Sequence, residues 1–220
     1  MPDRPRLTFF LDVDNTLLDN DAAKAEMDRE LAALLGEDGA ADFWRTYEEI
    51  RAEETVVDIP TTIARWCERQ GEPERRFALA DLFMSFDFRR FLYPDALAVL
   101  SRLRSLGKVA ILSDGDPLYQ SAKIHRSGLA DAVDGHVAVY PHKERHLTEL
   151  AAAFPADRFV FIDDKPTVLQ KIAALAPFPT STIFIRQGKY ARSVPPDFTP
   201  TRFCDSLSEL LFVESWSSVP

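Results

Sequence analysis

Short apolar runs recur along the chain, and each is followed by a polar turn and then by a helical pattern. The runs are rich in Val, Ile and Phe and almost continuously apolar, which is typical of strands covered on both faces of a parallel sheet. They predict five strands, within residues 6–14, 107–116, 135–142, 157–165 and 181–189. Strands that alternate with helices predict right-handed crossovers and a doubly wound parallel α/β sheet.

Apolar residues spaced three or four apart lie between the strands and indicate amphipathic helices. These helices are predicted at residues 94–106, 117–127, 143–154 and 166–175. In the first of them, Leu97, Leu100 and Leu103 form one apolar stripe. Beyond the last strand the chain is rich in proline and is expected to run over the surface. A short final helix is expected there, with a capping box formed by Ser206 and Glu209.

The segment of residues 20–89 breaks the alternation of strands and helices, and it contains no strand-like run. Four apolar stripes with spacings of three, four and seven predict that it is entirely helical, with most of its aromatic residues in its own core. We therefore expect two domains. An α/β core domain comprises residues 1–19 and 90–220, and an all-helical cap domain, residues 20–89, is inserted after the first strand.

Composition and charge limit the possible functions. The 220 residues are 46% hydrophobic and 28% charged, as in an ordinary globular protein, and the net charge is -9. This charge disfavours a nucleic-acid partner but allows a small phosphorylated substrate in a cleft of local positive field. No apolar run approaches the roughly 18 residues of a membrane span, and the N-terminus lacks a signal-peptide pattern. With only two distant cysteines, Cys67 and Cys204, we expect a cytoplasmic protein with reduced thiols; its oligomeric state is not indicated.

Polar residues that could perform chemistry follow three of the predicted strands. In an open parallel sheet, ligands bind beyond the carboxyl ends of the strands, so these loops are expected to converge. A set of carboxylate oxygens with high charge suits Mg²⁺, which would also relieve the repulsion between neighbouring acids. The residues are Asp12 and Asp14 after the first strand, Ser113, Asp114 and Gly115 after the second, and Asp163 and Asp164 after the fourth.

Taken in order, these residues resemble the four motifs of the haloacid dehalogenase-like hydrolase superfamily. The resemblance covers about residues 7–186, and it implies a Rossmann-like core with a helical cap of the C1 type between the first and second motifs. The motifs are matched by Asp12, Asp14 and Thr16 (Asp-x-Asp-x-Thr), by Ser113 at a strand end, by Lys143 opening a later helix, and by the paired acids Asp163 and Asp164.

The resemblance implies a Mg²⁺-dependent phosphatase that acts on a small phosphorylated metabolite. Asp12 would attack phosphorus to give an aspartyl-phosphate, and Asp14 would be the general acid for the leaving oxygen and then the base for water. The metal would be held by the side chains of Asp12 and Asp164 and by the main-chain carbonyl of Asp14. Asp163 would act through a water or orient its neighbours, and the choice between the two adjacent acids rests on analogy.

The resemblance also implies a phosphate site and shows two departures from the common pattern. Ser113 and the N–H groups of Asp114 and Gly115 would hold phosphate oxygens, while Lys143 would offset negative charge. Asn15 stands where glycine is frequent, although asparagine also tolerates a left-handed backbone. Asp114 places a negative charge beside the expected anion. Its side chain either points away, or it weakens phosphate binding or recognises a cationic part of the substrate.

Other functions remain open at this point. Carbon–halogen hydrolysis would use the first aspartate, but halide leaves without protonation, so Asp14 argues against it. A phosphomutase would keep all four motifs. Phosphonate cleavage would need a cap lysine for Schiff-base chemistry, and Lys24, the only lysine of the cap segment, lies close to the first motif. A non-catalytic binding protein on the same fold is the alternative of a different class.

Two further groups of residues bear on substrate specificity and on metal binding. Substrate specificity is expected from cap side chains, for which Lys24, Arg45, Arg51 and Arg65 are candidates, although each is also explained as a solvated helix residue. His142 and His146 have the four-residue spacing of helical zinc ligands. However, the metalloprotease pattern requires Glu directly after the first His, where this chain has Lys143. We therefore expect no zinc site there.

Overall fold

The computed structural model describes residues 6–54, 58–213 and 216. The expectation that the N-terminus lacks a signal-peptide pattern depends in part on residues 1–5, which lie outside the described residues. A six-stranded sheet forms its centre, with all paired strands parallel and in the order β3-β2-β1-β4-β5-β6. The predicted doubly wound α/β fold is thus confirmed. The strands are β1 (Leu7–Leu11), β2 (Lys108–Asp114), β3 (Val137–Tyr140), β4 (Arg158–Asp163), β5 (Thr180–Ile185) and β6 (Arg202–Cys204).

Side chains that alternate along the strands fill a core on each face of the sheet. On β1, Phe9 enters one core and Phe10 the other, and both side chains are almost fully buried. The Phe9 face packs against α5 (Ala96–Arg104), α7 (Leu129–Ala132) and the 3-10 helix η4 (Leu207–Phe212). The Phe10 face packs against α8 (Leu147–Ala153) and α9 (Pro166–Leu175). The strand ends are therefore held rigidly, which fixes the side chains that follow them.

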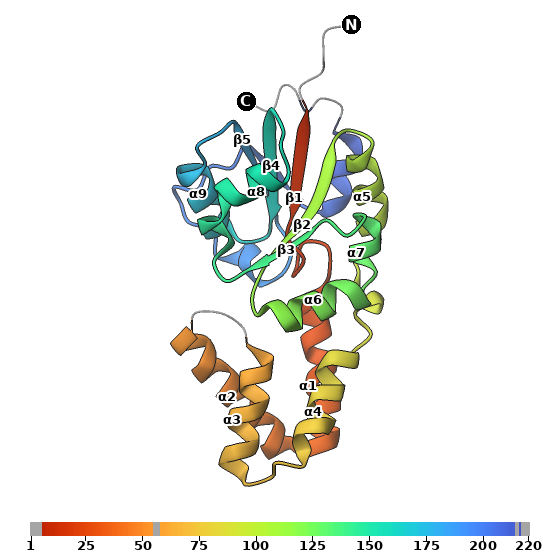
Figure 1. Cartoon of the computed structure of the whole chain (residues 1–220), viewed down its shortest axis with the longest axis vertical. Helices are drawn as coiled ribbons and strands as arrows, with labels where there is room; N and C mark the ends of the chain where they lie inside the picture. The colour runs from red at the N-terminus through yellow and green to blue at the C-terminus, as the bar shows by residue number, and fades with distance from the viewer. Residues whose placement is uncertain (1–5, 55–57, 214–215, 217–220) are drawn as a thin grey trace, which may run out of the picture.

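Four helices between β1 and β2 pack beyond the carboxyl ends of the strands (Figure 1). They are α1 (Asn20–Leu35), α2 (Glu37–Glu54), α3 (Ile59–Gln70) and α4 (Arg75–Ser85), and we call them the helical segment. Their aromatic residues form a core as the sequence predicts: Phe43 stacks on Phe83 at 5.2 Å between ring centres, and Trp66 is buried beside them. The short helix η1 (Phe88–Phe91) then leads back to the sheet domain.

Aspartate side chains cap the N-termini of two of these helices. Asp19 accepts a hydrogen bond from the N–H of Ala22, and Asp58 accepts one from the N–H of Thr61, so each satisfies a donor that the first helical turn leaves unpaired. Between the sheet and the helical segment lies α6 (Pro117–Arg126), whose first turn is capped by Asp116. Among the described residues, no helix has the length and apolar character needed to span a membrane.

Three local predictions need correction. The helix expected over 143–154 is divided into the 3-10 helix η2 (Lys143–Arg145) and α8, because Lys143 is drawn into the buried carboxylate cluster described below. Leu97 is 51% exposed, because the stripe of α5 that faces the sheet is formed by Val99, Leu100 and Leu103. The tail adds a sixth strand, β6, to the sheet instead of only crossing the surface.

One prediction for the C-terminal part of the chain is confirmed. The capping box of Ser206 and Glu209 is present at the start of η4, with the Glu209 carboxylate accepting the N–H of Ser206 at 3.2 Å. A further 3-10 helix, η3 (Lys189–Arg192), follows β5. Gly188, directly before η3, has a φ of +66°, and this turn brings η3 against the loop that follows β1.

Candidate active site

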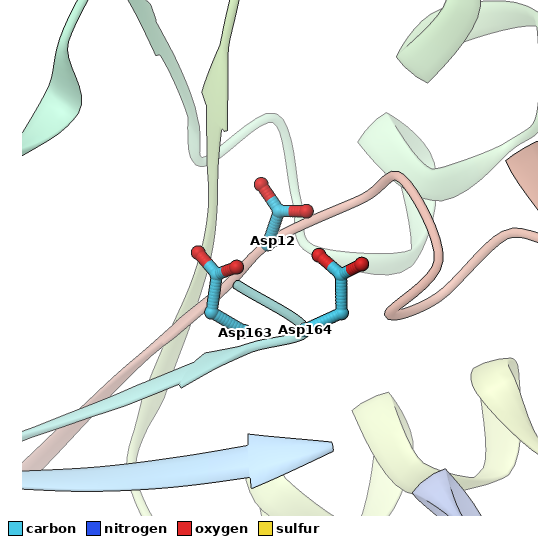
Figure 2. Close-up of side chains that lie close together, drawn as sticks. All are labelled: Asp12, Asp163 and Asp164. Atoms are coloured by element: carbon cyan, nitrogen blue, oxygen red, sulfur yellow. The ribbon is translucent and has the colours of Figure 1, made fainter. Parts of the chain in front are cut away.

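Three aspartates meet where β1 and β4 end side by side. These strands pair in register up to Leu11 and Ile162, and the N–H of Asp12 then donates to the carbonyl of Ile162 at 2.9 Å. Asp163 and Asp164 follow Ile162 directly. Oxygen atoms of Asp12, Asp163 and Asp164 lie within 4.8 Å of one another, and Figure 2 shows the three carboxylates side by side. The predicted convergence of these strand ends is therefore observed.

Lys143 neutralises part of this negative charge. Its Nζ lies 2.5 Å from Oδ1 of Asp12 and 2.7 Å from Oδ2 of Asp163, and it also donates to the carbonyl of Leu112 at 3.2 Å. The side chain is 1% exposed. Burial acts against the ammonium charge, but the attraction of Asp12 and Asp163 outweighs it and raises the pKa of Lys143. Lys143 is therefore a permanent cation at the centre of the cluster.

Asp114 holds Lys143 in place. Its Oδ1 accepts the main-chain N–H of Lys143 at 3.0 Å, and its Oδ2 lies 3.4 Å from Nζ. Although burial opposes the charged carboxylate, the nearby cation Lys143 lowers the pKa of Asp114. The side chain of Asp114 thus turns toward η2 and is a partner of Lys143, a contact that the sequence did not indicate.

The two adjacent acids of β4 differ in their hydrogen bonding. Asp163 has a partner on each oxygen, since Oδ2 faces Lys143 and Oδ1 accepts the N–H of Lys165 at 2.8 Å. Asp164 is fully buried, and neither of its oxygens has a partner among the described residues; the same holds for Oδ2 of Asp12. Three buried carboxylate oxygens thus lack a donor, an arrangement that is costly unless a proton or a cation is bound.

The pKa values of these carboxyl groups reflect the same lack of hydrogen-bond donors. Burial raises the pKa of Asp12 to about 7, against the attraction of Lys143. Burial, with the added repulsion of Asp163 and Asp12, raises the pKa of Asp164 to about 9. A hard divalent cation would restore the charged forms, and the donor set consists of oxygen atoms only. Asp164 and the unpartnered Oδ2 of Asp12 therefore fit a Mg²⁺ site, whereas both oxygens of Asp163 already have partners.

Asp14 points to a different set of partners. Its Oδ1 and Oδ2 lie 2.8 Å and 3.0 Å from Nζ of Lys123 on α6, and Gln120 of the same helix donates to Oδ2 at 3.1 Å. Burial favours the neutral acid, but the charge of Lys123 outweighs it and lowers the pKa of Asp14. Lys123 also donates to Oδ1 of Asn20 at 3.1 Å, so this contact joins the first motif to α1.

The expected phosphate-binding loop is partly engaged in internal hydrogen bonds. Ser113 is buried, and its Oγ accepts from Nε2 of Gln120 at 3.3 Å. The N–H of Gly115 donates to the carbonyl of Tyr140 at 3.3 Å. Gly115 has a φ of +134°, and a Cβ there would lie 2.9 Å from the Gln120 side chain. Gln120 therefore fills the space beside this loop, which sequence reasoning did not anticipate.

Comparison with known proteins identifies the family of this chain. A family model described as haloacid dehalogenase-like hydrolase matches residues 7–174. The chain belongs to the haloacid dehalogenase-like (HAD) hydrolase family. No curated protein matched the sequence.

Several solved structures of HAD-like proteins resemble this one. A haloacid dehalogenase-like hydrolase from Burkholderia xenovorans LB400 is 32% identical, with a TM-score of 0.87 over 96% of this chain and 97% of that chain. The HAD-hydrolase YfnB from Bacillus subtilis, bound to magnesium, is 19% identical, with a TM-score of 0.66 over 96% and 99%. An L-2-haloacid dehalogenase from Xanthobacter autotrophicus with covalently bound chloropropionic acid is 18% identical, with a TM-score of 0.59 over 93% and 96%. The last two likenesses concern the fold alone.

Within this HAD-family chain, the structure adds residues that the motifs did not indicate. Gln120 and Lys123 lie three apart on α6, the helix that starts directly after the second motif, and both are 3% exposed. The sequence signal that could have indicated Lys123 is its position on the inward-facing stripe of α6, a helix that begins at the edge of the sheet where the site lies. Lys165, directly after the paired acids, is a further cation: burial opposes its charge, but nearby Asp12 raises its pKa.

The loop of the first HAD motif also begins the helical segment. Asn15 has a φ of +59°, as its tolerance of a left-handed backbone allowed. Its Oδ1 accepts the N–H groups of Asn20 and Asp21 at 3.0 Å and 3.2 Å, so it caps the first turn of α1. The asparagine that stands where glycine is frequent therefore ties the loop of the first motif to the helical segment.

Proposed function

We propose that the protein is a Mg²⁺-dependent phosphatase that acts on a small phosphorylated metabolite through an aspartyl-phosphate. The observation that supports this most directly is the buried carboxylate of Asp164, whose two unpartnered oxygens lie beside the unpartnered Oδ2 of Asp12. Such a pair is stable in its charged form only with a bound cation. The helical segment would be the cap, of the C1 type, and would exclude water from the reaction.

In this proposal Asp12, Asp164 and the main-chain carbonyl of Asp14 would hold Mg²⁺. When bound, it supplies positive charge beside the oxygens of the phosphoryl group. Lys143 would keep Asp12 ionised and oriented through its 2.5 Å contact, and Asp163 and Asp114 would keep Lys143 in position. Each of these residues is buried or nearly so, which limits the reorganisation needed during the reaction.

The reaction would take place in two steps. In the first, an oxygen of Asp12 forms a bond to phosphorus, the bond from phosphorus to the leaving oxygen breaks, and Asp14 gives that oxygen a proton. In the second, Asp14 takes a proton from water, and the water oxygen attacks phosphorus and releases inorganic phosphate from Asp12. The two carboxylates thus perform different roles at one substrate atom.

Asp14 must hold a proton before the first step. In the substrate-free arrangement Lys123 lowers the pKa of Asp14, so the carboxylate is ionised. A phosphoryl group brings negative charge next to Asp14 and competes with it for Lys123, and both effects raise the pKa of the acid. We infer that substrate binding itself prepares Asp14 as the proton donor.

A panel of phosphomonoesters with and without Mg²⁺ tests the proposal. We expect inorganic phosphate to be released from part of the panel, with activity lost in EDTA and restored by Mg²⁺. The Asp12→Asn variant should be inactive while retaining its fold. Release of phosphate by that variant, or no turnover on a broad panel with Mg²⁺, would contradict the proposal. Transfer of phosphate to a second position of the substrate would instead identify a phosphomutase.

The second candidate is hydrolysis of a carbon–halogen bond. The ion pair of Asp14 with Lys123 favours it, because a halide leaves without a proton and an ionised Asp14 is then no obstacle. Asp12 would displace the halide and water would cleave the resulting ester. Release of chloride from 2-chloropropionate in the presence of EDTA, together with no phosphate release from the panel, would establish this alternative.

The cysteines and the net charge bear on the compartment and the partners of the protein. Cys67 and Cys204 are both free and buried, which supports a reducing, cytoplasmic location. Beyond the phosphorylated substrate, we propose neither nucleic acid nor membrane as a partner, since the net charge of -9 is unsuited to either anionic surface.

A further inference from the structure

A cavity of about 270 Å³ lies between the helical segment and the sheet domain. We call the part lined by Asp14, Asp114 and Lys165, next to the carboxylate cluster, the inner end, and the part lined by residues of α1, α2 and η3 the outer end. The two parts meet at Tyr190 of η3, whose ring centre lies 5.9 Å from Nζ of Lys165. This volume is at the small end for metabolite sites. A substrate whose phosphoryl group reaches the inner end would therefore place its leaving group against the outer end.

Positive charge is in excess inside this cavity. Six lysine and arginine side chains line it, against three acidic ones, which leaves an excess of three in a protein whose net charge is -9. Each acid is already paired: Asp14 with Lys123, Asp114 with Lys143, and Glu144 with Lys171 at 3.1 Å. The lining cations are Lys24, Arg51, Lys123, Lys165, Lys171 and Lys189.

Three of these cations gather at the outer end. Arg51 of α2 donates to the hydroxyl of Tyr190 at 3.5 Å, and Nζ of Lys189 lies 5.2 Å from the centre of the same ring. Lys24 of α1 lies over the ring of Trp44 at 4.4 Å. Burial, together with the nearby positive charges of Lys189 and Arg51, lowers the pKa of Lys24, which indicates that the three cations share one positive field.

Little negative charge compensates this group. The carboxylate of Glu48 lies 3.8 Å from Nζ of Lys24 and 3.1 Å from Nη1 of Arg51, so one acid serves two cations. Among the residues that the structure describes, Lys189 forms no ion pair. These three cations come from three separate elements and gather beside the rings of Trp44 and Tyr190, which solvated side chains on a single helix face would not do. The arrangement instead suits an anion from outside the chain.

The backbone also brings this group to the reaction site. Gly188 has a φ of +66°, and a Cβ added there would lie 2.5 Å from the side chain of Asn15 in the first motif loop. Only a glycine allows η3 to approach so closely, and the next two residues are Lys189 and Tyr190. The start of η3, with Lys189, is therefore held close to the loop that contains Asp12 and Asp14.

We propose that the leaving group of the substrate contains a second anionic group, a carboxylate or a phosphate, which binds among Lys24, Arg51 and Lys189. This inference rests on the proposed phosphatase function and names the substrate class. The phosphoryl group lies at the inner end of the cavity near Lys165 and Lys143, and the second anion lies at the outer end. Phosphorylated acids and bisphosphates fit this pattern, and neutral sugar or alcohol monophosphates lack the second contact.

Matched substrate pairs test the inference. We expect kcat/KM to be about tenfold or more higher for 3-phosphoglycerate than for glycerol 3-phosphate, or for fructose 1,6-bisphosphate than for fructose 6-phosphate, with the difference mainly in KM. A preference within the first pair identifies a carboxylate, and one within the second identifies a phosphate. High salt should reduce either preference.

Substitutions of the outer cations test whether these residues cause the preference for the doubly anionic substrate. Lys189→Met and Arg51→Met should each lower the preference for the doubly anionic substrate about tenfold. Arg45→Met is the matched control, because Arg45 lies on α2 outside the cavity and pairs with Asp42 at 2.9 Å. It should leave the preference as in the wild type. Since both substrates of a pair are measured on the same preparation, their ratio does not depend on how much of a variant is folded.

The outcomes distinguish this inference from the proposed function. Equal kcat/KM within both pairs, or a preference that survives in Lys189→Met and Arg51→Met, would overturn the inference while the phosphatase function stands. No phosphate release from any substrate by the wild-type protein with Mg²⁺ would overturn the proposed function, and this inference with it.

Discussion

Nζ of Lys123 lies 2.8 Å from one carboxylate oxygen of Asp14 and 3.0 Å from the other, although 109 positions separate the two residues in the chain. The lysine side chain is 3% exposed and that of Asp14 is 22% exposed, so solvent screens the pair only in part. The proposed general acid is thus controlled by a cation on α6 and not by its neighbours in the first motif. The pH dependence of activity should reveal this control.

Lys123→Met should raise the pKa of Asp14, because the largest factor that lowers it is removed. Since a general acid must be protonated, activity falls as pH rises through its pKa, and the variant should show this fall about one pH unit or more higher. The measurement is kcat/KM against pH for an alkyl phosphate, whose leaving oxygen needs a proton.

Lys123→Arg is the control for this experiment, because it keeps the positive charge and should keep the pH at which activity falls. The same profile measured on p-nitrophenyl phosphate, whose leaving group needs no proton, should respond less to Lys123→Met. An unchanged profile for the alkyl phosphate in Lys123→Met would show that Lys123 does not control the proton donor.

Asp164→Asn should abolish the stabilisation of the protein by Mg²⁺. In the wild type we expect saturating Mg²⁺ to raise the melting temperature by about 5 °C or more, since a ligand that binds only the folded state stabilises it by mass action. The variant lacks one of the charged ligands and should show almost no shift. Asp87→Asn, which alters an exposed carboxylate outside the site, is the control and should respond to Mg²⁺ as the wild type does. An undiminished shift in Asp164→Asn would exclude Asp164 as a ligand.

The stability of the metal-free protein should fall as pH rises from about 4 to about 9. Asp12 and Asp164 have folded-state pKa values of about 7 and about 9, above the ordinary value of 3.8, so the folded state binds protons that the unfolded state has released. Their stabilising effect is complete below pH 3.8 and is lost as pH passes through 7 and then 9. Chemical unfolding at a series of pH values measures it.

Two comparisons make this dependence specific. Between about pH 7 and 9 the titration of Asp164 dominates, so Asp164→Asn should have a flatter profile there. Because Mg²⁺ binds the deprotonated carboxylates, its stabilising effect should increase with pH over the same range. A metal-free protein whose stability rose over the range from about pH 5 to about pH 9 would contradict the assignment of raised pKa values to this cluster.

Gly188→Ala should destabilise the protein by about 2–4 kcal/mol. A positive φ costs a non-glycine residue about 1 kcal/mol, and the new Cβ would also collide with Asn15, adding about 1–3 kcal/mol of overpacking. Gly71→Ala is the matched control, because Gly71 has a similar φ of +71° but no atom within 4 Å of the place that a Cβ would occupy. Gly71→Ala should lower the stability only by the conformational cost of a positive φ, about 1 kcal/mol. Equal losses of stability in the two variants would show that Gly188 is not in close contact with Asn15.

The sequence by itself determined five of the six strands and the edge of the sheet at which the candidate site lies. Asp12, Ser113 and Asp163 each follow or end an apolar run, and parallel strands must bring such ends to one edge. The helical segment was also predictable, because amphipathic spacing depends on neighbours three and four residues apart. These features are local, or they follow from a rule that applies to every parallel sheet.

Tertiary structure alone decided which groups meet at that edge. The pairing of Asp14 with Lys123, and the unpaired oxygens of Asp164 beside an occupied Asp163, depend on side-chain directions that no local pattern encodes. β6, with three residues, is too short to show a period, and Lys143 leaves the helical register because its charge is satisfied only by carboxylates far away in sequence. Contacts of this kind depend on which distant segments the crossovers bring together, and so they appear only in the folded chain.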